Sequence, residues 1–342
     1  MVPQPSEDNH YEIFINIFNI MEKTLICELL EIKYPIIQGG MLWLATAELA
    51  AAVSNAGALG VISPLAGMEM EGDPSKNLED QLAKINHLTN KPYGVNIPLY
   101  LEYSGILIDI LLKSEVKIII TAAGSPANFT EVLRKKGIKV IHVVSSVKQA
   151  KKAESCAVDG VIAAGIEAAA HHGIDELPLF SLLPQVADAI SIPVIAAGGI
   201  SDARGVAAAF ALGAEGVQLG TRFVAVEENI AHSNYKQAII DAQDVDTVIT
   251  CRKIVPARSL KTQFTNRLSK LEDSGASVQD LMDFIGYRRN RISQIQGHLD
   301  KGEAYCGASA GLIKEVLTVQ EVVHRLVKGY EKIVKQLPQS LK

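Results

Sequence analysis

Two adjacent histidines, His171 and His172, are the side chains in this 342-residue chain that best suit acid–base chemistry. An imidazole ordinarily titrates close to neutral pH, so either could act as a general base or hold an anion. The segment before them, Gly165-Ile166-Glu167-Ala168-Ala169-Ala170, is rich in small residues, which would let a loop lie against a flat ligand. Spacing alone does not choose between the two histidines, and an exposed loop position is the alternative for both.

Two other polar residues could take part in the same site. His142 lies within an apolar run and is either a strand-end functional group or a core histidine whose hydrogen bonds are satisfied. Glu167 precedes His171 by four residues and could bind a ligand hydroxyl or orient the loop. A metal site would need a third converging ligand, and the spacing offers none, so we expect no metal.

Two glycine turns in the stretch 192–223 predict a phosphate site. Each follows a short, β-branched apolar run of the kind that forms a buried parallel strand. The first turn contains Gly198 and Gly199, and the second contains Gly220 and Thr221. In a (β/α)₈ barrel, the loops after the last two strands bind phosphate through backbone N–H groups. The alternative is that these glycines only make tight turns.

Eight short apolar runs alternate with amphipathic segments from Pro35 onward, which predicts a TIM barrel of the α/β class with its active face at the strand C-termini. A doubly wound open sheet is the alternative, weakened because no G-x-G-x-x-G follows the first run. The expected strands are Ile36–Gln38, Leu59–Ile62, Tyr93–Asn96, Ile118–Ala122, Val140–Val143, Gly160–Ala164, Pro193–Ala196 and Gly216–Leu219.

The chain after Phe223 changes character and predicts an added helical region. Its expected helices are 227–242, 260–275, 278–286 and 316–334. A barrel needs one helix after its last strand, so we expect the rest to cover the active-site face and to exclude water. The expected division is a disordered tail over 1–22, a barrel over 23–242 and the helical extension over 243–342. Gly307–Gly311 is expected to return to the site, with a plain loop as the alternative.

Composition narrows the function classes. Hydrophobic residues make up 48% of the chain, which is enough for a large core, and the net charge of −5 argues against nucleic-acid or anionic-membrane partners. No apolar run is long enough for a membrane span. The four scattered cysteines fit reduced thiols. We therefore expect a cytoplasmic protein, with a homodimer as an open alternative to a monomer.

Taken together, five motifs resemble the nitronate monooxygenase (2-nitropropane dioxygenase-like) flavoproteins and the related flavin-dependent enoyl-ACP reductases II. The motifs are Gln38-Gly39-Gly40-Met41, Gly94-Val95-Asn96, Gly165-x-Glu167-Ala168-x-x-His171-x-Gly173, Ala196–Asp202 and Leu219–Phe223. The resemblance implies a TIM barrel with noncovalent FMN. It places phosphate contacts at Gly198, Gly199, Gly220 and Thr221, flavin-ring contacts at Gly40, Met41, Asn96, Gly165, Glu167 and Ala168, and the active-site histidine at His171.

Three departures from the family pattern fall where a substrate would be selected. Ala169-Ala170 replaces the usual pair of glycines, His172 follows the active-site histidine, and Gly307–Gly311 differs from the usual G-Q-x-A-G. The alanine methyl groups should narrow the loop and favour a small or polar substrate over a long acyl chain. These differences leave the substrate open.

Four functions fit the sequence to different degrees. The first is oxidation of alkyl nitronates with O₂ to a carbonyl compound and nitrite. The second is NAD(P)H-dependent reduction of enoyl thioesters or quinones, with hydride passing through the flavin. A sugar-phosphate isomerase or lyase would explain the phosphate site but not the set of Gly40, Met41, Asn96 and His171. A non-catalytic flavin-binding protein is the weakest of the four.

Overall fold

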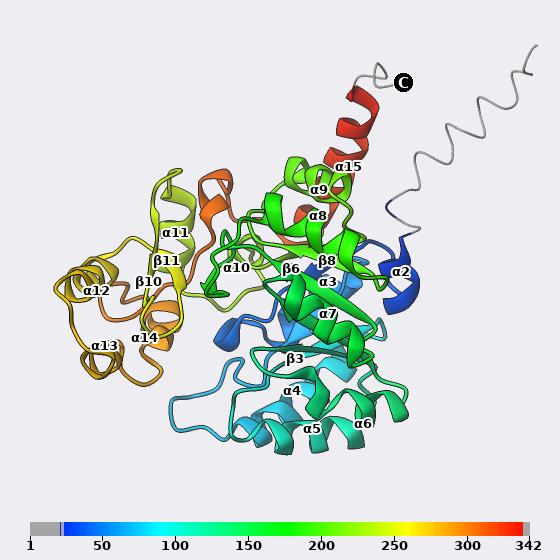
Figure 1. Ribbon diagram of the computed structural model, residues 1–342, viewed down its shortest axis with the longest axis horizontal. Coiled ribbons are helices and arrows are strands. Elements are labelled where there is room, and N and C mark those ends of the chain that lie inside the picture. The colour runs from blue at the N-terminus through cyan, green and yellow to red at the C-terminus, as the bar shows by residue number, and fades with distance from the viewer. Residues whose placement is uncertain (1–20, 22–23, 338–342) are drawn as a thin grey trace, which may run out of the picture.

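The computed structural model describes Met21 and residues 24–337, and its centre is a closed barrel of eight parallel strands (Figure 1). The strand order is β1-β9-β8-β6-β5-β4-β3-β2, and a parallel bridge between Ile37 and Leu59 joins the two end strands. The predicted TIM barrel is confirmed, and the predicted tail lies outside the described residues apart from Met21. The barrel strands are β1 Ile36–Gln38, β2 Gly60–Ile62, β3 Tyr93–Pro98, β4 Ile118–Ala122, β5 Lys139–Val144, β6 Gly160–Ala164, β8 Val194–Ala197 and β9 Gly216–Leu219.

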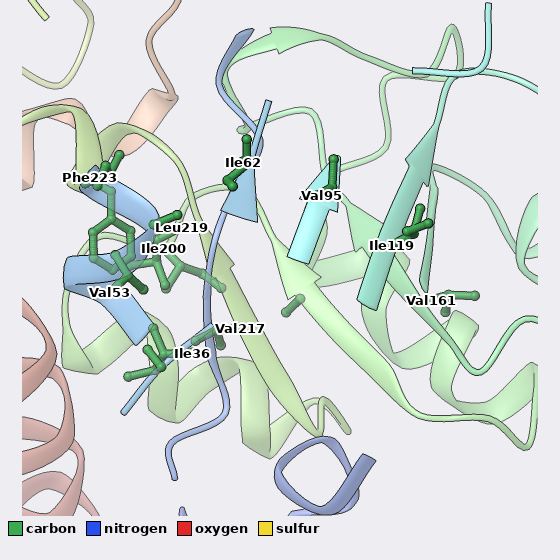
Figure 2. Packing of buried hydrophobic residues seen from close by; sticks show 14 of the residues in the cluster. Ile36, Val53, Ile62, Val95, Ile119, Val161, Ile200, Val217, Leu219 and Phe223 are labelled. Atoms are coloured by element: carbon green, nitrogen blue, oxygen red, sulfur yellow. The ribbon is translucent and has the colours of Figure 1, made fainter. Parts of the chain in front are cut away.

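Both faces of the strands are buried, which explains why their sequences are continuous apolar runs rather than alternating ones. Along β4, Ile119 packs in the outer cluster, between the strands and the helices, while Ile118 and Ile120 pack in the inner one. Figure 2 shows the outer cluster, with Val95 and Ile119 on neighbouring strands. The inner cluster fills the barrel and includes side chains of the short helix α2 (Leu25–Leu30).

A ring of helices surrounds the barrel, and each of the first seven strands is followed by one. Their starts follow sequence signals: Thr46, Ser146 and Asp202 accept hydrogen bonds from the first turns of their helices through their side chains. The helices are α3 Ala47–Asn55, α4 Pro74–Leu88, α5 Ser104–Lys113, α6 Thr130–Lys135 after the short η3 Pro126–Asn128, α7 Val147–Ser155, α8 Leu179–Ala189 and α9 Ala203–Ala211.

The eighth helix of the ring is α15 (Val319–Gln336), which packs against α9 and α3. It lies beside α9 in Figure 1, at the opposite end of the molecule from the other late helices. The sequence placed this helix within the 243–342 extension. The division at residue 242 stays a prediction, and α15 lies beyond it although it packs on the barrel.

The segment between β9 and α15 forms a lobe on one side of the barrel (Figure 1). The lobe contains two strands that the sequence did not predict, and they join the barrel loop strand β7 (Ala170–His171) in a small antiparallel sheet. No helix among the described residues combines the length and hydropathy of a membrane span. The elements of the lobe and of the turns that lead into it are α10 Thr221–Val224, α11 Ser233–Asp241, β10 Thr247–Thr250, β11 Ala257–Leu260, α12 Gln263–Asp273, α13 Val278–Ile285, α14 Arg289–Gln296 and η4 Ala308–Leu312.

Candidate active site

A cavity opens at the C-terminal ends of the barrel strands, between the barrel and the lobe. Of the ten residues predicted to contact a cofactor, eight line this cavity: Gly40, Met41, Glu167, Ala168, Gly198, Gly199, Gly220 and Thr221. The other two, Asn96 and Gly165, lie directly behind lining residues. The structure therefore brings together segments that are up to 180 residues apart in the sequence.

One end of the cavity, here called the glycine end, is formed by Gly198, Gly199, Gly220 and Thr221. The backbone at Gly198 and Gly199 has φ of 102° and 70°, which L side chains rarely adopt. Within the described part of the chain, the N–H groups of Gly199, Ile200 and Gly220 donate to no acceptor. Unpaired N–H groups that converge in this way form an anion-binding concavity.

The lobe segment after Cys306 closes over the glycine end. The Gly307 N–H donates to Thr221 Oγ1 at 2.9 Å, and the Ala308 N–H donates to the Glu167 carbonyl at 2.9 Å. A Cβ at Gly307 would lie 3.1 Å from that carbonyl, a tight contact that glycine avoids. The prediction that Gly307–Gly311 returns to the site is confirmed.

The first barrel loop supplies the opposite wall of the cavity. Gly40 lies so close to the Asn96 side chain that a Cβ there would be 2.5 Å from it. The Asn96 amide donates to the Ile120 carbonyl at 3.2 Å, which fixes the amide on its strand. A glycine backbone and a fixed side-chain amide give this wall a flat surface with hydrogen-bonding capacity.

Glu167 has a local structural partner as well as a place in the cavity. Both carboxylate oxygens accept from the Leu179 N–H, at 3.0 and 2.9 Å, at the start of α8. A carboxylate is stabilised at a helix N-terminus by the free N–H groups and the helix dipole. Glu167 therefore orients its loop, which is one of the two roles expected from the sequence.

His171 lies next to the cavity, against the lining residue Tyr305, and the group of His171, Tyr235 and Tyr305 is here called the histidine end. It is the second residue of β7 and pairs with Ala257 of β11, so the lobe fixes its backbone. Its ring packs against Tyr305, with centroids 5.8 Å apart. Tyr305 lines the cavity, whereas His171 is not itself among the lining residues. His171 is exposed at the surface, but neighbouring groups partly desolvate its imidazole and so lower the pKa of His171, which favours the neutral form.

The other two histidine candidates are less well placed. His142 is buried on its strand, and its Nδ1 lies 2.7 Å from Thr121 Oγ1, so it is a core histidine with a partner. The Nε2 atom of His172 is buried without a hydrogen-bond partner in the described structure. Burial, with a smaller contribution from Arg258, lowers the pKa of His172 to about 4. Neither residue lines the cavity.

Several lining residues were not predicted from the sequence, and they come from both the barrel and the lobe. Tyr235, on the first lobe helix, is buried and lines the cavity. Ser201 follows the first glycine turn, and its hydroxyl lies 2.6 Å from that of Ser309, so the G-G-I-S motif could have indicated it. The missed lining residues include Ser201, Gln218, Tyr235, Gln294, Tyr305 and Ser309.

These features fit a flat ligand with one anionic end. The glycine end offers unpaired N–H groups to a phosphate, the loop of Gly40 offers a flat wall, and the histidine end offers a neutral imidazole beside an aromatic ring. Among the described residues, no group of three or more His, Cys, Asp or Glu side chains could hold a metal ion. The donor set thus suits an FMN-like molecule.

Comparison with known proteins gives a consistent family. A family model described as nitronate monooxygenase matches residues 23–104 and 101–329. A probable nitronate monooxygenase of Staphylococcus saprophyticus is 36% identical, covering 73% of this chain and 82% of the relative. A (3aS,4S,5R,7aS)-5-hydroxy-7a-methyl-1-oxo-octahydro-1H-indene-4-carboxyl-CoA dehydrogenase of Rhodococcus jostii is also 36% identical, covering 74% of this chain and 69% of the relative.

Two solved structures share the whole architecture. FabK from Thermotoga maritima superposes with a TM-score of 0.86 at 39% identity, covering 92% of this chain and 98% of that one. A nitroalkane oxidase from Streptomyces ansochromogenes superposes with a TM-score of 0.77 at 26% identity, covering 92% of this chain and 99% of that one.

Proposed function

The chain belongs to the nitronate monooxygenase family, and from that membership we propose that it oxidises alkyl nitronates with O₂ to a carbonyl compound and nitrite. The family is one of flavin-dependent oxidoreductases, so the chain is an enzyme of that class. The observation that carries the proposal is the family match across residues 23–329. The nitroalkane oxidase with the same fold supports a nitro compound as the substrate class.

We propose that the cofactor is FMN, bound with its phosphate at the glycine end. The unpaired N–H groups of Gly199, Ile200 and Gly220 would donate hydrogen bonds to the phosphate oxygens, and Thr221 lies beside them. Gly40, Met41, Asn96, Gly165, Glu167 and Ala168 would surround the ring system. When bound, the flavin supplies the electron transfer between the substrate and O₂.

His171 is proposed as the catalytic side chain. Its lowered pKa keeps the imidazole mostly neutral at pH 7, so its free ring nitrogen can accept the α-proton of a neutral nitroalkane. At lower pH, the imidazolium form would attract the anionic nitronate. His171 packs beside Tyr305, which lines the cavity, so it can contact a substrate that binds next to the flavin ring.

The alternative function is NAD(P)H-dependent reduction of an enoyl thioester or a quinone. FabK, at 39% identity and a TM-score of 0.86, favours it, and the Rhodococcus relative is a dehydrogenase whose named substrate is a CoA thioester. In this reaction NADH or NADPH would be the reductant. Against it, Ala169 and Ala170 line the cavity with methyl groups where the family usually has glycines.

An anaerobic reduction experiment distinguishes the two functions. The purified protein is mixed separately with propyl-nitronate, NADH and NADPH, and the flavin absorbance is followed. The proposal expects bleaching by the nitronate, followed by nitrite release when O₂ is admitted. Bleaching by NADH or NADPH with turnover of a crotonyl thioester, and none by the nitronate, would establish the reductase instead. A colourless protein that binds no added FMN would exclude both.

Two further properties stay proposals. No disulfide joins the four cysteines, which supports a reducing compartment such as the cytoplasm. A homodimer is proposed as the alternative to a monomer, and sedimentation velocity of the flavin-loaded protein would distinguish them.

A further inference from the structure

A buried carboxyl group lies behind the histidine end of the cavity. The Glu303 side chain is 4% exposed, and its Oε1 atom has no hydrogen-bond partner in the described structure. Its Oε2 atom accepts a hydrogen bond from the Tyr305 hydroxyl at 3.1 Å. An ionised carboxylate in such a place would be unusual, because a buried charge with one donor is costly.

No cation among the described residues compensates this carboxyl. The nearby guanidinium groups of α14 are used elsewhere: Arg289 Nε donates to the Lys301 carbonyl at 2.9 Å, and Arg291 pairs with Glu69 at 2.8 Å. The titratable groups that face Glu303 are Tyr305 and the thiol of Cys251.

Burial is the main cause of the shifted pKa of Glu303. It raises the pKa of Glu303 to about 7, against a smaller opposing effect of the Tyr305 hydrogen bond. Glu303 therefore carries a proton through the lower part of the neutral range and loses it above that range.

Tyr305 connects Glu303 to the reaction pocket. Its hydroxyl is held by Glu303, with Asn290 as a second partner, and its carbonyl accepts from the Tyr235 hydroxyl. Its ring lines the cavity and packs on His171 at a tilt of 59°. A continuous set of contacts thus runs from Glu303 through Tyr305 to His171.

We propose that Tyr305 and Glu303 are positioning residues for His171: Tyr305 fixes the orientation of the imidazole, and protonated Glu303 fixes Tyr305. The proposal rests on the proposed function only for the catalytic role of His171. A neutral carboxyl can accept from the Tyr305 hydroxyl without burying a charge. After ionisation, the hydrogen bond from Tyr305 strengthens, but Glu303 has one side-chain donor for two charged oxygens, so the buried charge destabilises the segment around it.

The pH dependence follows from the direction of the shift. The native pKa of Glu303 lies above its unfolded value, so the stabilisation is fully present below the unfolded pKa of 4.5 and is lost as pH rises to about 7. Above pH 7, the folded protein carries the full cost of the buried charge.

Glu303→Gln tests this directly, because the amide can accept the Tyr305 hydrogen bond but cannot ionise. The first measurement is Tm of the flavin-loaded protein from pH 5 to 8.5, with no substrate present. The wild type should lose Tm relative to Glu303→Gln by several degrees as pH rises. The exposed control Glu71→Gln should follow the wild type. Parallel curves for wild type and Glu303→Gln would overturn the proposal.

The second measurement reports His171 itself and also works if Glu303→Gln does not fold. In protein with labelled histidines, the His171 ring resonance is assigned by its absence in His171→Ala. Tyr305→Phe keeps the ring but removes the hydroxyl through which Glu303 holds it, so the ring-current shift of the His171 resonance should become smaller. Any pH-dependent step in that resonance that reports the titration of Glu303 should move to higher pH, because the hydrogen bond that lowers the pKa of Glu303 is gone. Tyr305→Leu should abolish the ring-current shift.

A His171 resonance that is indifferent to all three variants would overturn the positioning role. These readouts need no turnover, so they stay informative if nitronate proves not to be the substrate. If it is the substrate, Tyr305→Leu should lower kcat by about 10²-fold at unchanged flavin content, the size expected from a misplaced catalytic group.

Discussion

The glycine end and the histidine end of the cavity are built by different means. At the glycine end, backbone atoms at the ends of two neighbouring barrel strands form the site, and the first of the two turns is made by glycines with positive φ. At the histidine end, His171, the buried Tyr235 and the half-buried Tyr305 come from segments that meet only when the lobe has folded onto the barrel.

This difference separates cofactor binding from substrate chemistry. A backbone site persists in any sequence that keeps the barrel and its glycines, so it suits a ligand shared by the whole family. A site made from the lobe can change without disturbing the barrel. We therefore expect substitutions at the glycine end to remove the flavin, and those at the histidine end to leave it in place and change turnover.

The largest effect is expected from Gly199→Glu. A side chain at φ 70° is strained, and its carboxylate would occupy and repel the phosphate position. The purified variant should retain no flavin, measured as flavin absorbance per protein. Gly275→Glu is the matched control, since Gly275 has a φ of 87° but lies in open space in the turn between α12 and α13. Full flavin in Gly199→Glu would show that the phosphate site is elsewhere.

His171→Ala should have the next largest effect, and only on turnover. A general base contributes about 10² to 10⁴ in rate, so kcat/KM for a neutral nitroalkane should fall by that order. The fall in kcat/KM should be smaller for the preformed nitronate, because no proton has to be removed from it. Both substrates are measured at matched flavin content.

His172→Ala is the control for this prediction. Neither histidine lines the cavity, but His171 packs on the lining residue Tyr305, whereas burial lowers the pKa of His172 to about 4, so removal of the His172 imidazole should leave turnover close to wild type. A larger loss in His172→Ala than in His171→Ala would mean that the wrong histidine was identified.

The same difference explains what the sequence could and could not predict. The barrel and the glycine end were predictable because each depends on local signals: apolar runs that make buried strands, and glycines directly after them. The adjacent glycines Gly198 and Gly199 indicate, from the sequence alone, a turn with positive φ. Eight of the ten predicted cofactor contacts line one cavity for this reason.

The histidine end was only half predictable. Gly307–Gly311 indicated that this segment returns to the site, but nothing in the sequence singles out Tyr305 or Glu303, because their roles come from a cavity and a buried carboxyl formed by distant segments. The two lobe strands were missed for a related reason. They are four residues long, one of them, β11, contains Arg258, and they are stabilised by pairing with each other and with β7.

The smallest effect, and the one that best separates the two ends, is expected from Ala170→Gly. Ala170 has a φ of 64°, in a region where a side chain costs roughly 1–2 kcal/mol. Glycine removes that cost, while the greater freedom of the unfolded chain offsets about 0.4–1 kcal/mol of the gain. The variant should therefore be slightly more stable, by up to about 1 kcal/mol in a denaturant titration.

Ala169→Gly is the matched comparison, because Ala169 also lines the cavity but is not among the residues with positive φ. It gains no relief from strain, so it should lose roughly 0.4–1 kcal/mol of stability through the unfolded state. Both variants remove a methyl group from the cavity wall, and both should accept longer nitroalkanes than the wild type without losing flavin. Opposite changes in stability with the same change in substrate range would show that the alanines narrow the site and that Ala170 alone is strained. Equal stability changes would refute the strain, and an unchanged substrate range would refute the narrowing.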